Sequence, residues 1–334
     1  MINVGINGFG RIGRLVLRAS LEKLNKNIKV VAINDIGNIN QNAHLFKYDS
    51  IHGKTEAKVE VRENIMSINN TPITFFSRRL PEEIAWSECG VDIVLECTGL
   101  FTSKEKAKGH LNNNVKKVII SAPSSDADIT VVYGVNDNSL NEKHDIVSNA
   151  SCTTNCLAPI AKVINEKFGI NSGFMTTVHS FTSDQKILDS LHSDLRRART
   201  ASSSMIPTST GAAKAVGLVL PELNGRLDGT AIRIPTPNVS MIDFTFQSSS
   251  KLTVSDINKS ILESSNNAFK NIISYNTEPL VSVDFNHNPA SSIFDATQTQ
   301  VVGDNFGRIL SWYDNEWGFS NRMIDVCSIL GNYL

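Results

Sequence analysis

The sequence predicts an α/β protein with two domains, the first built on a mostly parallel sheet and the second an α+β domain with a mostly antiparallel sheet. Short apolar runs alternate with helical patterns up to residue 151, which is typical of parallel βαβ units. Beyond the helical pattern Leu157–Phe168, longer apolar runs such as Ser240–Phe246 take over and favour antiparallel strands. We expect domains at 1–151 and 152–317, with a closing helix at 318–334 that packs back on the first domain.

Length and charge agree with this division and exclude some partners. At 334 residues the chain is long for a single hydrophobic core. Its net charge of −1 argues against nucleic acid as the main partner and against an anionic membrane surface. The N-terminus lacks the pattern of a signal peptide, and no apolar run approaches the ~20 residues of a membrane span. Five cysteines, an odd number without paired metal-ligand spacing, fit free thiols in the cytoplasm.

A glycine-rich segment follows the first predicted strand, Ile2–Ile6. Gly8, Gly10 and Gly13 form the pattern G-x-G-x-x-G, and a helical pattern runs from Ile12 to Leu24. Between a strand and a helix, these glycines permit a tight turn, close approach of the backbone to a pyrophosphate, and close helix–strand packing. The segment therefore indicates a Rossmann-type dinucleotide-binding domain.

Asp35 supports this interpretation. It follows the predicted strand Lys29–Ile33, 22 positions after Gly13, close to the ~20 expected for an acid that binds the adenosine ribose. Its carboxylate would repel a 2′-phosphate, which favours NAD over NADP. The alternative is an acidic surface residue after an ordinary strand–turn–helix unit.

The remainder of the first domain departs once from β–α alternation. Lys58–Val61 and Ile73–Phe76 predict a hairpin, with a turn at Asn69–Pro72. Arg78 and Arg79 follow, either lining the adenine pocket or forming a solvated pair. Further strands are expected at 91–96, 117–120, 129–133 and 146–147, and a helix at 103–112 with Ser103 as its N-cap.

The segment Ser148–Pro159 places Cys152 between a strand and the predicted helix Leu157–Phe168. Free N–H groups and the helix dipole would stabilise a thiolate there. The alternative is a capping Ser/Thr/Asn cluster with a buried cysteine. His179, directly after the predicted strand Gly173–Val178, is a candidate base for this thiol; the alternative is a polar residue that serves only the fold.

Several long motifs in fixed order resemble the phosphorylating glyceraldehyde-3-phosphate dehydrogenases over essentially the whole chain. They are the segments 6–14, 148–159, 177–182, 207–216, 233–240 and 311–316. The resemblance implies that Cys152 attacks the aldehyde of glyceraldehyde 3-phosphate while His179 accepts the thiol proton. Hydride transfer to NAD then leaves a thioester, which inorganic phosphate releases as an acyl phosphate. A homotetramer is also implied.

The resemblance further implies two groups of binding residues. The sites for the substrate phosphate and for inorganic phosphate would use Ser151, Thr153, Thr182, Arg197, Thr210, Gly211 and Arg233. The contacts to NAD would use, besides the three glycines, Arg11, Ile12, Asp35, Arg79, Ser121 and Asn315. Hydroxyls, N–H groups and guanidinium groups are suitable ligands for phosphate.

Some positions differ from the family pattern. Ser190 and Leu191 stand where many NAD-dependent relatives carry Leu-Pro, so NAD preference depends more heavily on Asp35. Ser193 replaces a frequent Lys, and Phe319 replaces a frequent Tyr. Cys156, four positions after Cys152, is either a redox partner or a small buried thiol.

Two other functions are compatible with part of these residues. Erythrose-4-phosphate dehydrogenase shares the Cys/His chemistry, but Thr182 and the segment 208–215 favour the first function. A catalytically silent nucleotide- or nucleic-acid-binding protein is disfavoured because the candidate catalytic and phosphate-binding residues are intact.

Overall fold

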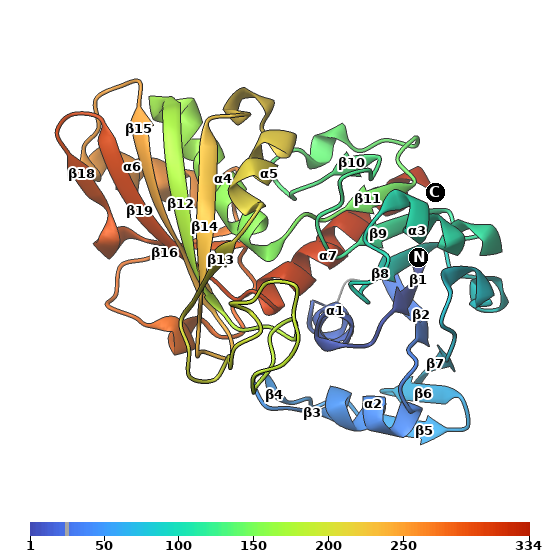
Figure 1. Ribbon diagram of the computed structural model, residues 1–334. Helices are drawn as coiled ribbons and strands as arrows, with labels where there is room; N and C mark the ends of the chain where they lie inside the picture. The colour runs from blue at the N-terminus through green and yellow to red at the C-terminus, as the bar shows by residue number, and fades with distance from the viewer. Residues whose placement is uncertain (24–26) are drawn as a thin grey trace. The chain divides into compact units, whose positions relative to one another are not determined.

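The computed structural model describes residues 1–23 and 27–334. The chain divides into two compact units (Figure 1). The first, the nucleotide unit, comprises Met1–Val131, Asp137–Ala150 and Ser320–Leu334. The second, the thiol unit, comprises Val132–Asn136 and Ser151–Phe319. The mixed architecture confirms the predicted fold class.

The described part of the nucleotide unit forms a nine-stranded sheet in the order β10-β11-β9-β8-β1-β2-β7-β6-β5. From β10 to β7 the strands run parallel, and β6 and β5 then continue antiparallel. The strands are β1 Ile2–Asn7, β2 Ile28–Asn34, β5 Val59–Arg62, β6 Ile65–Ile68, β7 Thr71–Phe76, β8 Ile93–Glu96, β9 Lys117–Ile120, β10 Ile129–Thr130 and β11 Ile146–Ser148. Strands β8, β9 and β11 are buried throughout, as expected for a parallel sheet.

Helices of this unit connect the parallel strands. They are α1 Arg11–Glu22, α2 Ile39–Lys47 and α3 Lys104–Ala107, and a small ribbon pairs β3 Tyr48–Asp49 with β4 Gly53–Lys54. Leu24, at the end of the first predicted helix, lies outside the described residues. Ser103 caps α3 as expected by accepting from the N–H of Lys106, and the segment then tightens into a 3₁₀ turn at Lys108–Asn113.

The predicted hairpin at 58–76 is wrong in detail, because a third strand, β6, lies between its two strands. Glu63 turns the chain into β6 with a φ of 52°, a left-handed conformation that sequence patterns do not predict for Glu. Asn69 and Asn70, with φ of 48° and 65°, form the turn into β7, as their residue type favours. Pro72 belongs to β7 itself, opposite Ser67.

The described part of the thiol unit forms an eight-stranded sheet in the order β13-β14-β12-β15-β19-β17-β16, with β18 paired to β19. Only β12–β14 and β16–β17 are parallel pairs, so the sheet is mostly antiparallel. The strands are β12 Ile170–Ser180, β13 Ile206–Ser209, β14 Leu227–Ile234, β15 Ser240–Ser248, β16 Ile273–Asn276, β17 Ser292–Asp295, β18 Gln300–Val302 and β19 Phe306–Tyr313. The helices are α4 Cys152–Phe168, α5 Ala212–Val219, α6 Val254–Asn266 and α7 Trp317–Leu330, of which α7 enters the nucleotide unit at Ser320.

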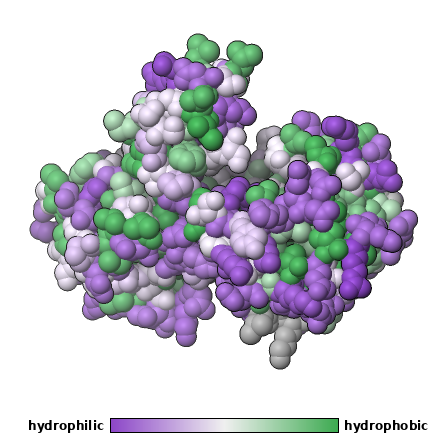
Figure 2. Space-filling model, turned by 90° about the horizontal axis from the view of Figure 1, so that it is seen from below, coloured by the Kyte–Doolittle hydropathy of each residue, from purple (hydrophilic) through white to green (hydrophobic). Residues whose placement is uncertain are grey.

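Hydrophilic side chains dominate the face of the molecule in Figure 2, where hydrophobic residues occur in small groups among them. Within residues 1–23 and 27–334, no helix combines the length and apolar character needed to cross a membrane.

Candidate active site

Cys152 is the first residue of α4, so the helix begins earlier than the predicted Leu157. Ser151 caps it: its hydroxyl accepts from the N–H of Thr154 at 3.1 Å. Ala150, with a φ of 56°, adopts a conformation that is uncommon for residues other than glycine and is typical of functional sites. The thiol therefore lies in the first turn, where the helix dipole favours negative charge.

His179 lies next to this thiol. It stands near the end of β12, and its Nε2 is 3.6 Å from Cys152 Sγ. The ring is buried, with 3% exposed, and its Nδ1 is 2.7 Å from the carbonyl oxygen of Ser180. The role of base requires the tautomer in which Nδ1 donates to this carbonyl and the Nε2 lone pair faces the thiol. The structure thus brings together the two residues that the sequence predicted as nucleophile and base.

Arg233 completes the immediate surroundings of the pair. β14 runs parallel to β12 and places Arg233 level with His179. Its Nη1 donates to the Ser180 carbonyl oxygen at 3.0 Å and lies 2.9 Å from His179 Nδ1. In the tautomer that the base role requires, Nη1 and Nδ1 are therefore two donors that share this one carbonyl oxygen. No carboxylate forms an ion pair with Arg233 in the part of the chain that the structure describes. This guanidinium is therefore a suitable partner for an anionic ligand.

The surroundings of the pair disfavour a thiolate on Cys152 alone and an imidazolium on His179 alone. Burial raises the pKa of the Cys152 thiol, although Arg233 and Thr153 counteract this rise. Burial and the charge of Arg233 lower the pKa of His179 to about 3. Proton transfer from Sγ to Nε2 leaves the total charge of the pair unchanged, so it avoids most of this penalty. We infer that the site forms its thiolate by transfer within the pair.

Tyr313 was not singled out in the sequence, yet it supports both partners. Its buried hydroxyl lies 2.8 Å from Thr153 Oγ1 and 2.9 Å from Thr177 Oγ1, and its ring meets that of His179 edge to face at 5.9 Å. The tyrosine therefore fixes the first turn of α4 against β12. No local pattern could indicate this contact, because Tyr313 and Thr153 are 160 positions apart.

Arg197, the second arginine predicted to bind phosphate, differs from Arg233 because it is paired with a carboxylate. It donates to Asp184 Oδ2 at 2.8 Å and to Thr208 Oγ1 at 3.0 Å. Its Nη2 also lies 3.4 Å from the carbonyl oxygen of Ser209, which brings the guanidinium beside the segment that leads to Thr210 and Gly211. Gly211 precedes α5, and a Cβ added there would meet nothing within 4 Å.

Three of the hydroxyls predicted to bind phosphate also make hydrogen bonds within the protein. Ser151 uses its hydroxyl for the helix cap, and Thr153 bonds Tyr313. Thr210 Oγ1 accepts from the N–H of Ala212 at 3.2 Å. Thr182 is half-buried just beyond the end of β12.

A separate cavity of about 240 Å³ lies in the nucleotide unit. Its lining includes Gly8, Gly10, Asp35 and Arg79 from the predicted set, together with Asn7, Asn34, Ile36, Arg78, Cys97, Thr98, Leu100 and Phe101. A Cβ added to Gly13 would lie 2.1 Å from the carbonyl oxygen of Gly8, so only glycine fits there. A Cβ on Gly10 would meet nothing within 4 Å, which leaves room for a pyrophosphate. These features fit a dinucleotide.

Asp35 and Arg11, two of the predicted cofactor residues, also make contacts within the nucleotide unit. Asp35 accepts from the N–H of Phe9 at 2.8 Å and of Gly37 at 2.7 Å, so it also shapes the glycine turn. Arg11 forms a 2.6 Å ion pair with Asp49. Although burial opposes it, the N–H groups of His52 and Ile51 and the Arg11 guanidinium lower the pKa of Asp49 to about 2. Ile12 lies in the first turn of α1, and Ser121 directly follows β9.

Asn315, in the thiol unit, has a fixed amide orientation. Its Oδ1 accepts from the hydroxyls of Ser180 at 2.8 Å and Ser240 at 2.9 Å. The amide nitrogen is thereby left as the donor for a ligand. Val239, directly before Ser240, has a φ of 66°, which is strained for a β-branched residue. Neither serine was singled out in the sequence.

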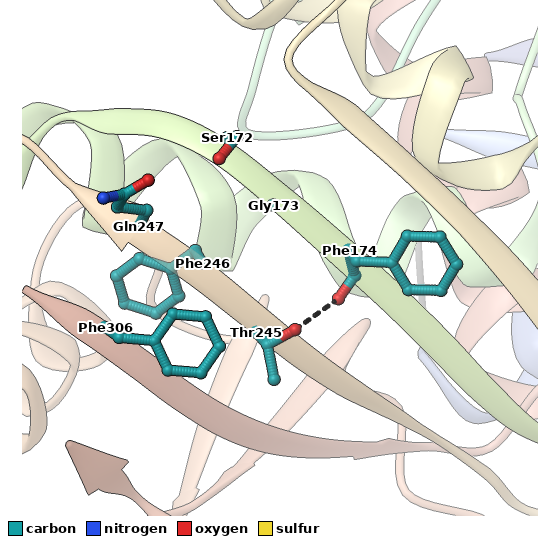
Figure 3. A pocket seen from close by; sticks show the side chains of 7 residues that line it. All are labelled: Ser172, Gly173, Phe174, Thr245, Phe246, Gln247 and Phe306. Carbon is teal, nitrogen blue, oxygen red and sulfur yellow. Dashed lines mark hydrogen bonds between the residues drawn. The ribbon is translucent and has the colours of Figure 1, made fainter. Parts of the chain in front are cut away.

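Figure 3 shows a further cavity of about 290 Å³ on the sheet of the thiol unit. In the pairing of β15 with β19, Phe306 lies opposite Gln247 whereas the buried Phe246 lies opposite Gly307, so the two rings belong to opposite faces of the sheet. Thr245 donates to the carbonyl oxygen of Phe174. No ionisable side chain lines this cavity. It therefore lacks groups for the chemistry of the Cys152 site.

Comparison with known proteins identifies two domains of one family in this chain. The family model of the glyceraldehyde 3-phosphate dehydrogenase NAD binding domain matches residues 2–104, and that of the C-terminal domain of the same family matches residues 151–315. The chain belongs to the glyceraldehyde-3-phosphate dehydrogenase family. The family assignment made from the sequence motifs is thereby confirmed, and NAD is the cofactor of the matched N-terminal domain.

Individual relatives cover the dehydrogenase from end to end. A glyceraldehyde-3-phosphate dehydrogenase of Xanthobacter flavus is 55% identical over 99% of this chain and 98% of its own length. That of Cereibacter sphaeroides is 55% identical over 100% and 99%, and that of Geobacillus stearothermophilus is 52% identical over 99% and 98%.

Asp35 gives a first test of the cofactor site in this dehydrogenase. We expect Asp35→Ala to raise the ratio of kcat/KM for NADP to that for NAD by roughly tenfold, because the repulsion of a 2′-phosphate is removed. Affinity for both cofactors should fall, since Asp35 also holds the N–H groups of Phe9 and Gly37. Steady-state kinetics with each cofactor measures the ratio. An unchanged ratio would assign cofactor choice to other residues.

Proposed function

We propose that the chain oxidises D-glyceraldehyde 3-phosphate to 1,3-bisphosphoglycerate with NAD and inorganic phosphate. The observation that carries this proposal is the Cys152–His179 pair beside Arg233, a cation with no carboxylate partner among the described residues. Family membership adds the substrate and the cofactor. We also propose a cytoplasmic homotetramer with the domain limits expected from the sequence.

Cys152 and His179 carry the covalent chemistry in this proposal. Sγ forms a bond to the aldehyde carbon as its proton passes to Nε2, and Nε2 then gives this proton to the former carbonyl oxygen, which becomes the hydroxyl of a thiohemiacetal. Bound NAD supplies the acceptor for the hydride that this carbon then loses. His179 takes the hydroxyl proton during that step, and a thioester remains on Sγ.

Arg233 has two roles in the proposed reaction. It lies against His179 Nδ1 and lowers the pKa of that imidazole. When a phosphate group neutralises the guanidinium, its influence on His179 weakens and the imidazole becomes more basic. Arg197, Thr182, Thr210 and Gly211 supply the remaining phosphate contacts. Attack of inorganic phosphate on the thioester carbon breaks the S–C bond and returns the thiolate.

The proposal is tested by turnover with and without inorganic phosphate, on glyceraldehyde 3-phosphate and on erythrose 4-phosphate, with NAD. We expect turnover of the first aldehyde to depend on phosphate and to exceed that of the second. Phosphate-independent oxidation of erythrose 4-phosphate as the faster reaction would favour the rival dehydrogenase. Binding of NAD without turnover of either aldehyde would favour a silent nucleotide-binding protein.

A further inference from the structure

We propose that a buried array of Glu96, His110 and Trp86 positions the walls of the NAD cavity, and that Glu96 is its central positioning residue. The inference rests on the proposed assignment of this cavity to the cofactor. The array lies within the nucleotide unit and takes no part in the thiol chemistry. Glu96 is the last residue of β8, a strand in the middle of the parallel sheet.

Glu96 is 1% exposed, and both of its oxygens are bound. Oε1 accepts from the N–H of Thr98 at 2.8 Å and from the hydroxyl of the same residue. Oε2 accepts from Asn7 Nδ2 at 2.6 Å and from His110 Nε2 at 3.0 Å. Donors from Thr98, Asn7 and His110 face both oxygens, so the group acts here only as an acceptor.

The direction of every hydrogen bond in the array is determined. The indole N–H of Trp86 can only donate, and it points at His110 Nδ1 at 3.1 Å. Nδ1 therefore carries no proton, and the imidazole proton lies on Nε2, which donates to Glu96. Asn7 Nδ2 lies 3.4 Å from the same Nε2; both are donors that share one carboxylate oxygen.

The chain of bonds continues into the walls of the cavity. Asn7 Oδ1 accepts from Asn34 Nδ2 at 2.8 Å. The amide of Asn34 in turn bonds the backbone N–H and carbonyl of Arg78 at 2.8 and 3.0 Å. Asn7, Asn34, Arg78 and Thr98 all line the cavity. One carboxylate thus fixes the ends of β1 and β8 directly, and through Asn7 the end of β2 and the backbone at Arg78.

An amide in place of this carboxylate cannot satisfy the same donors. In Glu96→Gln, the new NH₂ group would face either Thr98 or the Asn7 and His110 donors. For Asn7 to accept a hydrogen bond from this NH₂ group, the Asn7 amide would have to be reversed. Its own NH₂ group would then face the NH₂ group of Asn34, and neither could accept. The cavity walls would therefore rearrange although the shape of the side chain is almost unchanged.

The test compares binding of NAD and of ADP-ribose to Glu96→Gln and to the wild type, using calorimetry on the full-length protein. ADP-ribose lacks nicotinamide and reports on the adenosine half of the cofactor. We expect the Kd of both ligands to rise by about tenfold or more, while Cys152 reacts with iodoacetamide at the wild-type rate. Kd values within twofold of the wild type for both ligands would overturn the inference.

Two substitutions at His110 separate positioning from general support of the fold. His110→Gln can still accept from Trp86 and donate to Glu96, whereas His110→Leu can do neither. We expect the glutamine variant to bind NAD within about threefold of the wild type and the leucine variant to lose affinity as Glu96→Gln does. Ile119→Val, a truncation of a buried residue in β9, controls for lost stability and should bind NAD normally. If NAD binding were weakened equally in all four variants, the array would have only a structural role and the inference would be overturned. If the wild type failed to bind ADP-ribose, the assignment of the cavity to the cofactor would be overturned instead.

Discussion

Cys152→Ser is expected to abolish phosphate-dependent reduction of NAD, with a loss in kcat of at least about 10³-fold, as for removal of a catalytic nucleophile. A serine hydroxyl at this position keeps its proton near neutral pH, even at the first turn of a helix and beside an imidazole. The thiohemiacetal and the thioester would then not form at a useful rate. NADH absorbance, followed with glyceraldehyde 3-phosphate and inorganic phosphate, measures the loss.

The matched control is Cys156→Ser, one helical turn away. Cys156 Sγ lies 3.4 Å from Ser292 Oγ in a fully buried position. Burial raises the pKa of this thiol to about 12, so it remains protonated and takes no part in the chemistry. We expect Cys156→Ser to retain turnover. Wild-type turnover in Cys152→Ser would falsify the proposed covalent mechanism.

His179→Asn is expected to lower kcat by about 10²- to 10⁴-fold, the usual contribution of a positioned general base. Asparagine can still bond the Ser180 carbonyl, but it cannot take the thiol proton. Because burial raises the pKa of Cys152, loss of the internal acceptor should also slow alkylation by iodoacetamide near neutral pH. Stopped assays and alkylation rates against pH measure the two effects separately.

His44→Asn is the control for this second substitution, since His44 is an exposed residue of α2 in the nucleotide unit. It should alter neither the turnover nor the alkylation profile. An iodoacetamide profile of His179→Asn identical to that of the wild type would remove His179 from the role of base and leave only a structural role for the 3.6 Å contact.

The parts of the fold predicted best from the sequence depend on local patterns. Gly8 and Gly10 lie between a strand and a helix, Gly13 lies in the first turn of that helix, and Asp35 follows the next strand. These relations span few residues, so the sequence indicates them. The start of α4 was predicted five residues late, because Thr153, Thr154 and Asn155 have low helix propensity. The packing of the helix and the cap at Ser151 overcome that preference. Helix α2 was missed because its Asn-rich sequence resembles a loop, although Asn38 caps it.

Contacts between distant segments account for what the sequence could not indicate. Arg233 reaches His179 only because β14 pairs in parallel with β12, and no spacing along the chain encodes that register. The serines that hold Asn315 lie 135 and 75 positions before it. Glu96 and His110 look like an ordinary strand end and a helix residue, and only the folded chain shows that they share a buried hydrogen bond.

Ser180 serves two neighbours at once. Its carbonyl oxygen lies against His179 Nδ1, and its hydroxyl holds the amide of Asn315. A shift of this one residue would therefore displace the proton acceptor and the amide donor together. This linkage constrains any selection of variants that accept altered nicotinamide analogues. Variants that reorient the Asn315 amide through Ser180 would also displace His179, the proposed base. Ser240, which contacts Asn315 and the Ser180 N–H but not the imidazole, is the position from which the amide can be adjusted with the least effect on proton transfer.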